Sequence, residues 1–249
     1  MFVEVSGAAE VAMGAAAVGL LAGGCAYAAL WPGSQVFGKA LIAPRLDSGQ
    51  AREIALTFDD GPNPEWTPRL LDLLDRYGVK ATFFLVGKYA SDESVLVRYI
   101  ANAGHTVGNH SWSHPNLALT APGKVREELR NTKDALEQIT GKPVRYFRPP
   151  FGARRPDVLG AARSLGMTPV LWNAMTSDWS EPNSEKIAAV LRGKVEKLAA
   201  RGRAANVVLH DGGHLERAAN RGPSVRAAGA LLERFATEKK FVTVDAWEV

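Results

Sequence analysis

Short apolar runs alternate with amphipathic segments from residue 53 onward, and this alternation limits the possible folds more than any other feature. The runs that predict strands lie at 53–58, 81–86, 105–108, 144–148, 168–172, 206–209 and 241–244. The segments that predict helices lie at 65–77, 91–103, 122–139, 155–165, 183–201 and 224–238. Strands that alternate with helices pair in parallel through crossover connections. The pattern therefore predicts an α/β domain, built on either an open doubly wound sheet or a closed barrel.

The regular pattern fills most of the chain and sets its expected domain organisation. The length of 249 residues and an apolar content of 46% suffice for a sizeable core. We expect one folded domain over 52–249, preceded by a linker over 31–51. The net charge of +4 is mild, and the chain has no block of Lys and Arg interleaved with aromatic residues, so it does not indicate nucleic-acid binding. The single cysteine, Cys25, excludes an intrachain disulfide.

The N-terminal segment differs from the rest of the chain. Residues 11–30, VAMGAAAVGLLAGGCAYAAL, carry no charge and are just long enough to span the apolar core of a bilayer. We therefore expect residues 1–30 to form a hydrophobic N-terminal helix that anchors the protein in a membrane. A cleaved leader or lipid anchor and a packed soluble helix are the alternatives. The leader is less favoured because Glu4 and Glu10, and no basic residue, precede the run.

Polar side chains follow five of the predicted strands. In both candidate architectures, ligands bind at the carboxyl ends of the strands. The polar residues at these ends are Asp59 and Asp60, then Asn109, His110 and His114, then Arg148, then Asp178 with Trp179, and finally His210 and Asp211. Three of the five histidines thus gather on one rim with carboxylates and an arginine. We interpret this rim as a functional site.

The sequence His110-Ser-Trp-Ser-His114 predicts metal binding. If the pair lies on one helical turn, both imidazoles face the same way, and an acidic oxygen completes a three-ligand site with the pattern of catalytic zinc. Two histidines with this spacing and no further ligand are more often structural, but the two carboxylates on the same rim favour a metal. One carboxylate would bind the metal, and its neighbour would take a proton from water.

The remaining rim residues can supply the other groups that a hydrolase needs. A histidine on the opposite wall can protonate a leaving amine. Arg148 can pair with the base, although a structural salt bridge would use the same contact. Two prolines precede Phe151, whose backbone N–H could act as an oxyanion donor. This chemistry predicts a metal-assisted amide or ester hydrolase.

Five motifs in this order resemble the polysaccharide deacetylases, carbohydrate esterases that share the nodulation-type deacetylase domain. They are TFDDGP at 57–62, HSWSH at 110–114, RPPFG at 148–152, Asp178-Trp179 and Leu209-His210. The resemblance extends from about residue 52 to the C-terminus. It implies a distorted (β/α) barrel of seven or eight strands and a divalent metal, usually zinc. It also implies hydrolysis of the acetamido group of an N-acetylglucosamine-containing glycan, with release of acetate.

The resemblance also implies a role for each matching residue. It makes Asp59 the general base, His210 the general acid and Arg148 the residue that orients the base. The implied metal ligands are Asp60, His110 and His114. The implied substrate-binding residues are Phe151, Trp179 and Val208, the last two as walls of the pocket for the acetyl methyl group.

One position departs from the family pattern. The family usually has an aspartate three residues before the Asp178-Trp179 pair, where it tunes the catalytic histidine, and here that position is Met175. Methionine cannot accept a hydrogen bond from an imidazolium in the same way. Either Asp178 or Asp211 supplies the carboxylate, or the pKa of His210 is lowered. We expect an altered pH dependence or reduced activity on standard substrates, without loss of the metal.

We expect His105, inside a strand pattern, to be structural, and His214 either to border the cleft or to lie in a solvated loop.

A catalytically weak glycan-binding protein of the same fold and a hydrolase of another amide or ester are the alternative functions. An envelope glycan lies outside the cytoplasm, which favours an anchored domain facing outward. Positive charges after the run, at Lys39, Arg45 and Arg52, favour the opposite orientation.

Overall fold

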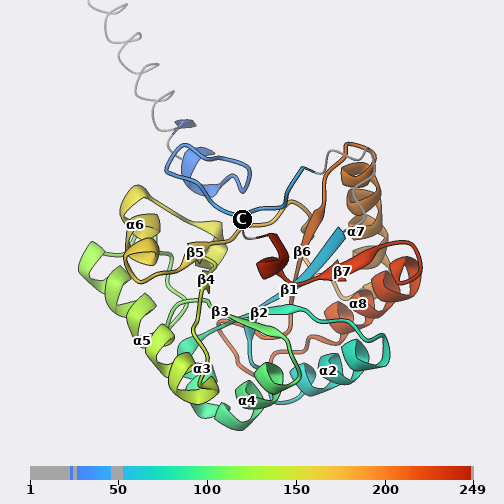
Figure 1. Cartoon of the computed structure of the whole chain (residues 1–249), viewed down its shortest axis with the longest axis horizontal. Coiled ribbons are helices and arrows are strands. Elements are labelled where there is room, and N and C mark those ends of the chain that lie inside the picture. The colour runs from blue at the N-terminus through green and yellow to red at the C-terminus, as the bar shows by residue number, and fades with distance from the viewer. Residues whose placement is uncertain (1–22, 25–26, 46–52, 248–249) are drawn as a thin grey trace, which may run out of the picture.

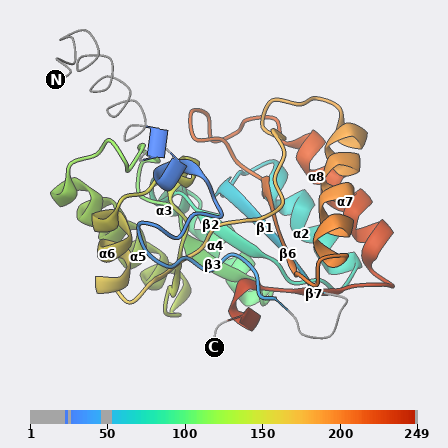
Figure 2. The same ribbon diagram turned by 90° about the horizontal axis from the view of Figure 1, so that it is seen from above.

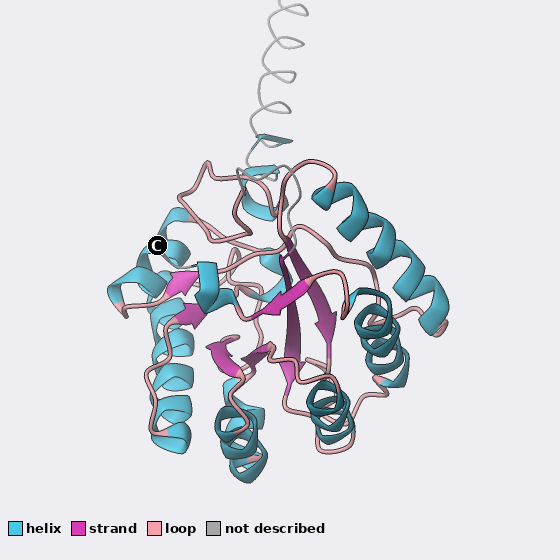
Figure 3. Ribbon diagram, turned by 45° about the vertical axis from the view of Figure 1, so that its right-hand side comes forward, coloured by secondary structure: helices cyan, strands magenta, loops and turns pink. Residues whose placement is uncertain are grey.

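A computed structural model describes residues 23–24, 27–45 and 53–247 of the chain. Parallel strands form one curved sheet surrounded by helices (Figures 1 and 3). The strands are β1 (Glu53–Gly61), β2 (Thr82–Leu85), β3 (Thr106–Asn109), β4 (Tyr146–Phe147), β5 (Thr168–Pro169), β6 (Ala205–His210) and β7 (Lys240–Val242). Their order is β5-β4-β3-β2-β1-β6, and β7 pairs with β1. The predicted parallel α/β architecture is therefore confirmed.

The helices lie outside the sheet and cover its outer face (Figure 1). They are α2 (Trp66–Arg76), α3 (Gly87–Asp92), α4 (Ser94–Asn102), α5 (Pro122–Thr140), α6 (Pro156–Ser164), α7 (Ser184–Ala199) and α8 (Gly222–Phe235), with short 3₁₀ turns η1 (Pro150–Gly152) and η2 (Val244–Trp247). The six predicted helices match α2 and α4 to α8. The short helix α3 was not predicted.

The sheet bends into a parallel half-barrel around β1. One edge of β1 pairs with β6, while the other pairs first with β7 and then with β2. The chain after β5 reaches β6 through an isolated bridge between Ala174 and Val207, which connects the two ends of the sheet path. The arrangement is consistent with the distorted (β/α) barrel that the sequence implies.

Alternating residues of β1 divide between the two faces of the sheet. Ile54, Leu56 and Phe58 belong to the main core between sheet and helices, and all three are buried. The residues between them face inward, so Thr57 and Asp59 point into the half-barrel. In the β1–β6 register, Asp59 lies directly opposite His210. Strand geometry therefore brings a predicted base and a predicted acid together.

The predicted linker, 31–51, packs against the domain over its described residues. The backbone N–H of Leu41 donates to the carbonyl of Pro169 at 2.8 Å, and Leu171 returns a bond of 2.8 Å to Leu41. The buried Arg154 guanidinium donates to the carbonyls of Trp31 and Ser34 at 2.6 and 3.0 Å. Residues 46–51 lie outside the described part of the chain.

Most of the predicted N-terminal anchor also lies outside the described residues. The structure describes only 23–24 and 27–30 of that segment, all within a helix. In the described part of the chain, no helix combines the length and apolar character that crossing a membrane requires.

Candidate metal centre and active site

The end of β1 presents two buried carboxylates to the same cleft. Asp59 is the last residue of the strand to keep regular pairing with β2, whose register shifts between Asp59 and Gly61. Asp60 adopts a φ of 69°, in the left-handed region that Asp tolerates better than most residues. This local change lets two adjacent side chains reach one site, although regular strand geometry would point them to opposite faces.

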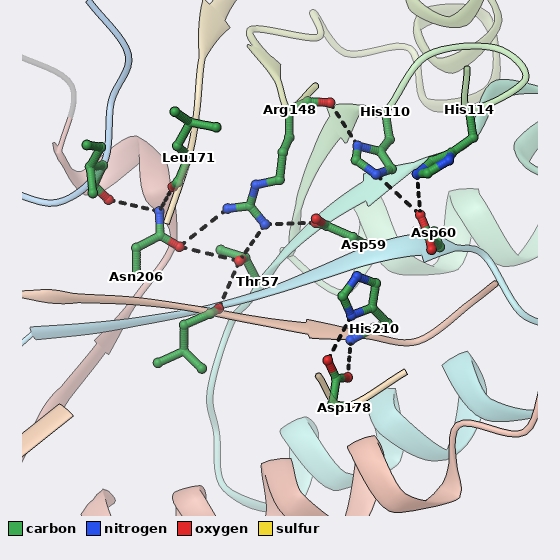
Figure 4. Close-up of polar contacts among 12 residues, drawn as sticks. Thr57, Asp59, Asp60, His110, His114, Arg148, Leu171, Asp178, Asn206 and His210 are labelled. Atoms are coloured by element: carbon green, nitrogen blue, oxygen red, sulfur yellow. Dashed lines mark hydrogen bonds and ion pairs between the residues drawn. The ribbon is translucent and has the colours of Figure 1, made fainter. Parts of the chain in front are cut away.

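Asp60, His110 and His114 form a compact set of potential metal ligands. The Nε2 atoms of His110 and His114 lie 3.3 and 3.0 Å from Oδ1 of Asp60 (Figure 4). One ligand atom from each residue lies within 4.8 Å of the other two, and all three residues are buried. The geometry therefore brings together the three predicted metal ligands.

The hydrogen bonds around this set fit a cation. Nδ1 of His110 lies 2.8 Å from the carbonyl oxygen of Arg148, which can only accept, so Nδ1 donates and Nε2 presents a lone pair to Asp60. Oδ1 of Asp60 is buried and accepts no hydrogen bond. An ionised oxygen facing an imidazole lone pair is the donor set that a divalent metal takes.

The loop that carries His110 and His114 is not the helical turn expected from their spacing. Residues 110–114 form an irregular loop after β3, in which Ser111 and His114 have φ values of 64° and 60°. The buried Glu128 of α5 holds the loop by accepting from both the backbone N–H and the hydroxyl of Ser113, at 2.8 and 2.9 Å. The helical assumption was wrong, but both imidazoles still reach Asp60.

Asp59 forms a buried ion pair with Arg148. Nη1 of Arg148 lies 2.7 Å from Oδ1 of Asp59 and donates to the Thr57 hydroxyl at 2.7 Å. The guanidinium also lies 4.1 Å from the centre of the Phe84 ring and 3.4 Å from Oδ1 of Asn206. Because each charge balances the other, the pair can remain buried. The predicted contact between Arg148 and the base is present.

His210 is paired with Asp178. Asp178 therefore supplies the carboxylate that the family pattern would place at position 175. Nδ1 of His210 lies 2.9 Å from Oδ1 of Asp178, whose Oδ2 accepts from the His210 backbone and from the Ser224 hydroxyl. Burial lowers the pKa of His210, but the charge and hydrogen bond of Asp178 outweigh it and raise the pKa to about 9. The alternative of a lowered pKa for His210 was therefore wrong.

The partner of His210 Nδ1 is Asp178, and neither Met175 nor Asp211 takes that place. Met175 packs against the buried cluster of Leu171, Trp172 and Val208. The Thr67 hydroxyl donates to the carboxyl of Asp211, which faces the turn at Gly61. Burial raises the pKa of Asp211 to about 7.

A cleft of about 680 Å³ is lined by Asp59, Asp60, His110, His114 and His210. Trp172, Met175 and Val208 form an apolar part of its wall. Phe151 and Trp179 also line it, and they remain 51% and 46% exposed. All three predicted substrate-binding residues, Phe151, Trp179 and Val208, thus border the same cleft as the metal-ligand set. The size and mixed lining suit a small polar ligand with an apolar group.

The two histidines outside the predicted site differ in role. His105 is buried, and its Nδ1 accepts from the Ala81 backbone at 3.1 Å, so the structural interpretation is confirmed. His214 borders the cleft, and its ring stacks on His114 with 4.6 Å between centroids. No local sequence pattern predicted the His214 contacts, because they depend on the path of the loop after β6.

Comparisons with known proteins agree with the motifs. The family described as polysaccharide deacetylase matches residues 47–170. A chitooligosaccharide deacetylase of Sinorhizobium fredii is 36% identical over 184 residues, which cover 74% of this chain and 82% of that protein. A peptidoglycan-N-acetylglucosamine deacetylase of Bacillus cereus is 41% identical over 135 residues. These residues cover 54% of this chain and 49% of that protein, so the chain spans about half of its length.

Solved structures share the fold. The Bc1960 peptidoglycan N-acetylglucosamine deacetylase has a TM-score of 0.72 and 33% identity, covering 83% of this chain and 91% of that one. The peptidoglycan deacetylase PdaC from Bacillus subtilis has a TM-score of 0.66 and 30% identity, covering 80% and 90%. A mutant of BA3943, described as a CE4 family pseudoenzyme with restored activity, has a TM-score of 0.73 and 26% identity, covering 84% and 70%. Since the fold also occurs in a pseudoenzyme, activity depends on the site residues and does not follow from the fold alone.

Proposed function

The chain belongs to the polysaccharide deacetylase family, a family of polysaccharide N-deacetylases, and we propose that it removes N-acetyl groups from a glycan containing N-acetylglucosamine. The products would be acetate and a glycan with a free amine. Peptidoglycan and chitin-like oligosaccharides are the candidate substrates, because they are the substrates named for the relatives.

In this proposal Asp60, His110 and His114 hold a divalent metal, with zinc preferred for its affinity for imidazole and carboxylate ligands. When bound, the metal supplies Lewis acidity and lowers the pKa of water towards about 7. The Nδ1–H of His110 donates to the Arg148 carbonyl, which fixes the tautomer that presents Nε2.

Asp59 and His210 would act as the general base and the general acid. Asp59 takes a proton from the attacking water, while Arg148 keeps its carboxylate in place. His210, protonated next to Asp178, gives a proton to the nitrogen that leaves as the amine. Trp179 and Val208, which line the cleft, accept the acetyl methyl group, and the Phe151 backbone N–H is the candidate oxyanion donor.

The observation that carries the proposal is the position of Asp59 and His210. They are direct partners across β1 and β6, and each has its own buried ion-pair partner. A glycan-binding protein would not need a base and an acid held in this way beside a metal-ligand set. The arrangement therefore favours an active hydrolase over a binding protein of the same fold.

Acetate release from N-acetylglucosamine oligomers and from peptidoglycan would test the proposal. The full chain is assayed with zinc, with a chelator and as Asp59→Asn. Release that needs zinc and is lost in the variant supports the deacetylase. Stoichiometric zinc binding without release would instead support the glycan-binding alternative or another amide or ester substrate.

We also propose that residues 11–30 anchor the protein in a membrane, with the domain outside the cytoplasm. The uncharged run supports the anchor, and the external location of envelope glycans supports the orientation. The basic residues at Lys39 and Arg45 oppose that orientation, and a protease-protection assay on intact cells would decide between the two.

A further inference from the structure

His214 contacts two of the three proposed metal ligands, although it comes from a different loop. Its Nδ1 lies 3.7 Å from Oδ2 of Asp60. Its ring stacks on His114 with an interplanar angle of 23°. His110 and His114 follow β3, whereas His214 follows β6, so residues from two loops meet at Asp60.

The position of His214 is fixed from several sides. The Tyr89 hydroxyl donates to the His214 backbone carbonyl at 3.0 Å. The Phe151 ring meets the imidazole edge to face, with 5.4 Å between centroids. At the preceding Gly213, a Cβ atom would lie 2.8 Å from both Ala219 and the Glu216 carbonyl, so the loop is closely packed there. The His214 side chain is 34% exposed, so these contacts place it at the rim of the cleft.

The two oxygens of Asp60 face different partners. Oδ1 lies next to His110 and His114, and Oδ2 lies next to His214. The distance of 3.7 Å exceeds a direct hydrogen bond, so the attraction is electrostatic or passes through a bridging water. Either contact opposes rotation of the carboxylate and keeps Oδ1 directed at the metal-ligand set.

We propose that His214 is a positioning residue that fixes the Asp60 carboxylate for metal binding through its ring N–H. This inference rests on the proposed metal role of Asp60. Polar partners of ligating carboxylates raise metal affinity, and removing one typically costs about 10- to 100-fold. The stacking on His114 is a second contact, which a test has to separate from the first.

The test compares zinc affinity of the full chain with that of three variants of residue 214, by competition with a chromophoric chelator. His214→Phe keeps an aromatic ring against His114 but has no N–H. His214→Gln keeps an N–H donor but has no ring, and His214→Ala removes both. Leu215→Ala is the matched control, because Leu215 lines the same cleft and is 89% exposed.

We expect His214→Phe and His214→Ala to weaken zinc binding by at least about 10-fold, and His214→Gln and Leu215→Ala to stay within about threefold of wild type. Melting temperatures without metal show whether each variant folds, and the Phe and Gln variants keep the test decisive if the Ala variant does not.

Two results would overturn the inference. If His214→Phe binds zinc like the wild type, the N–H does not position Asp60, even when His214→Ala is weak. If the wild type itself binds no zinc, the proposed metal site fails, and this inference fails with it. Because the readout is affinity and not acetate release, failure of the inference alone leaves the proposed function standing.

Discussion

Asp59 and Asp60 are adjacent in the chain but have different partners. Asp59 pairs with Arg148 at 2.7 Å, whereas Asp60 faces His110 and His114. Two buried carboxylates repel each other and lose hydration, so each needs its own compensation. The cation of Arg148 compensates the first, and a metal would compensate the second. The division of labour proposed for the pair follows from this difference in surroundings.

Replacing Asp59 by Asn tests its role as the base. Asn keeps an oxygen that accepts from Arg148, but it cannot take a proton at neutral pH. We expect kcat/KM for acetate release to fall by about 10²- to 10⁴-fold. Zinc affinity, measured in parallel, should change little because Asp59 is not among the proposed ligands. Activity close to wild type would exclude Asp59 as the base.

Replacing Asp178 by Asn tests its control of His210. His210 acts as an acid only while protonated, so activity is present below its pKa, which Asp178 raises, and is lost above it. Removing the Asp178 charge lowers that pKa, and we expect the alkaline limb of kcat/KM to move to lower pH by about one to three units. Both proteins are compared with the same metal, since a nearby cation also lowers the pKa.

The matched variant for this test is Met175→Asp, which adds a carboxylate and removes none. It should leave the alkaline limb in place or move it to higher pH. A limb that is identical in wild type and Asp178→Asn would show that Asp178 does not set the protonation of His210.

At the scale of elements, the loop 110–114 depends on α5. Glu128 accepts two hydrogen bonds from Ser113, one residue before a proposed ligand. The loop itself has two residues with positive φ, Ser111 and His114, and so has little intrinsic preference for this shape. The conformation of the loop therefore depends on its hydrogen bonds to α5.

Glu128→Ala should destabilise the protein and weaken its zinc binding. It removes two hydrogen bonds between Ser113 and the carboxylate of the buried Glu128, and we expect a loss of about 1–3 kcal/mol in the free energy of unfolding without metal. Glu127→Ala is the control, since Glu127 forms only an exposed ion pair with Lys124 and should change stability by less than about 1 kcal/mol. Equal melting temperatures for the two variants would contradict this role for Glu128.

The sequence predicted elements well where one periodicity dominates. The apolar runs 53–58 and 206–209 form β1 and β6, which pair with each other, and both strands were predicted. Helix α3 was missed because it is short and begins at Gly87 without a capping side chain. The predicted strand 168–172 is shorter as observed, because Leu171 bonds to Leu41 of the N-terminal segment and not to a neighbouring strand.

The site was predictable where motifs carry it, and less so where tertiary contacts decide. TFDDGP and the HSWSH spacing indicated residues that the fold brings together. Sequence left Asp178 and Asp211 as equal candidates to replace the missing aspartate, because only the fold shows which one faces the His210 ring. His214 had no sequence signal, since its contact with Asp60 joins residues 154 positions apart.

At the scale of the whole molecule, the N-terminal segment is joined to the rim of the half-barrel. Arg154 follows η1, close to the cleft residue Phe151, and binds the carbonyls of Trp31 and Ser34. Figure 2 shows this described segment running along the domain. Tyr27 and Trp31 stack on each other and remain 56% and 57% exposed. Such aromatic residues are typical of the boundary between membrane and water, which agrees with the proposed anchor.

Charges introduced into the uncharged run test the anchor. Each Arg at the centre of a membrane helix costs about 2.5–3.5 kcal/mol, so the double substitution Leu20→Arg and Leu21→Arg should release the chain from membranes. We expect the wild type to stay in the membrane fraction after a carbonate wash and the double variant to appear in the supernatant. Val190→Arg, on the exposed face of α7, is the control and should behave like the wild type. A wild type that is already washed off would contradict the anchor and favour a cleaved or packed N-terminal segment. Since the substitutions lie far from the cleft in sequence, acetate release by the double variant would also show whether the domain works without its anchor.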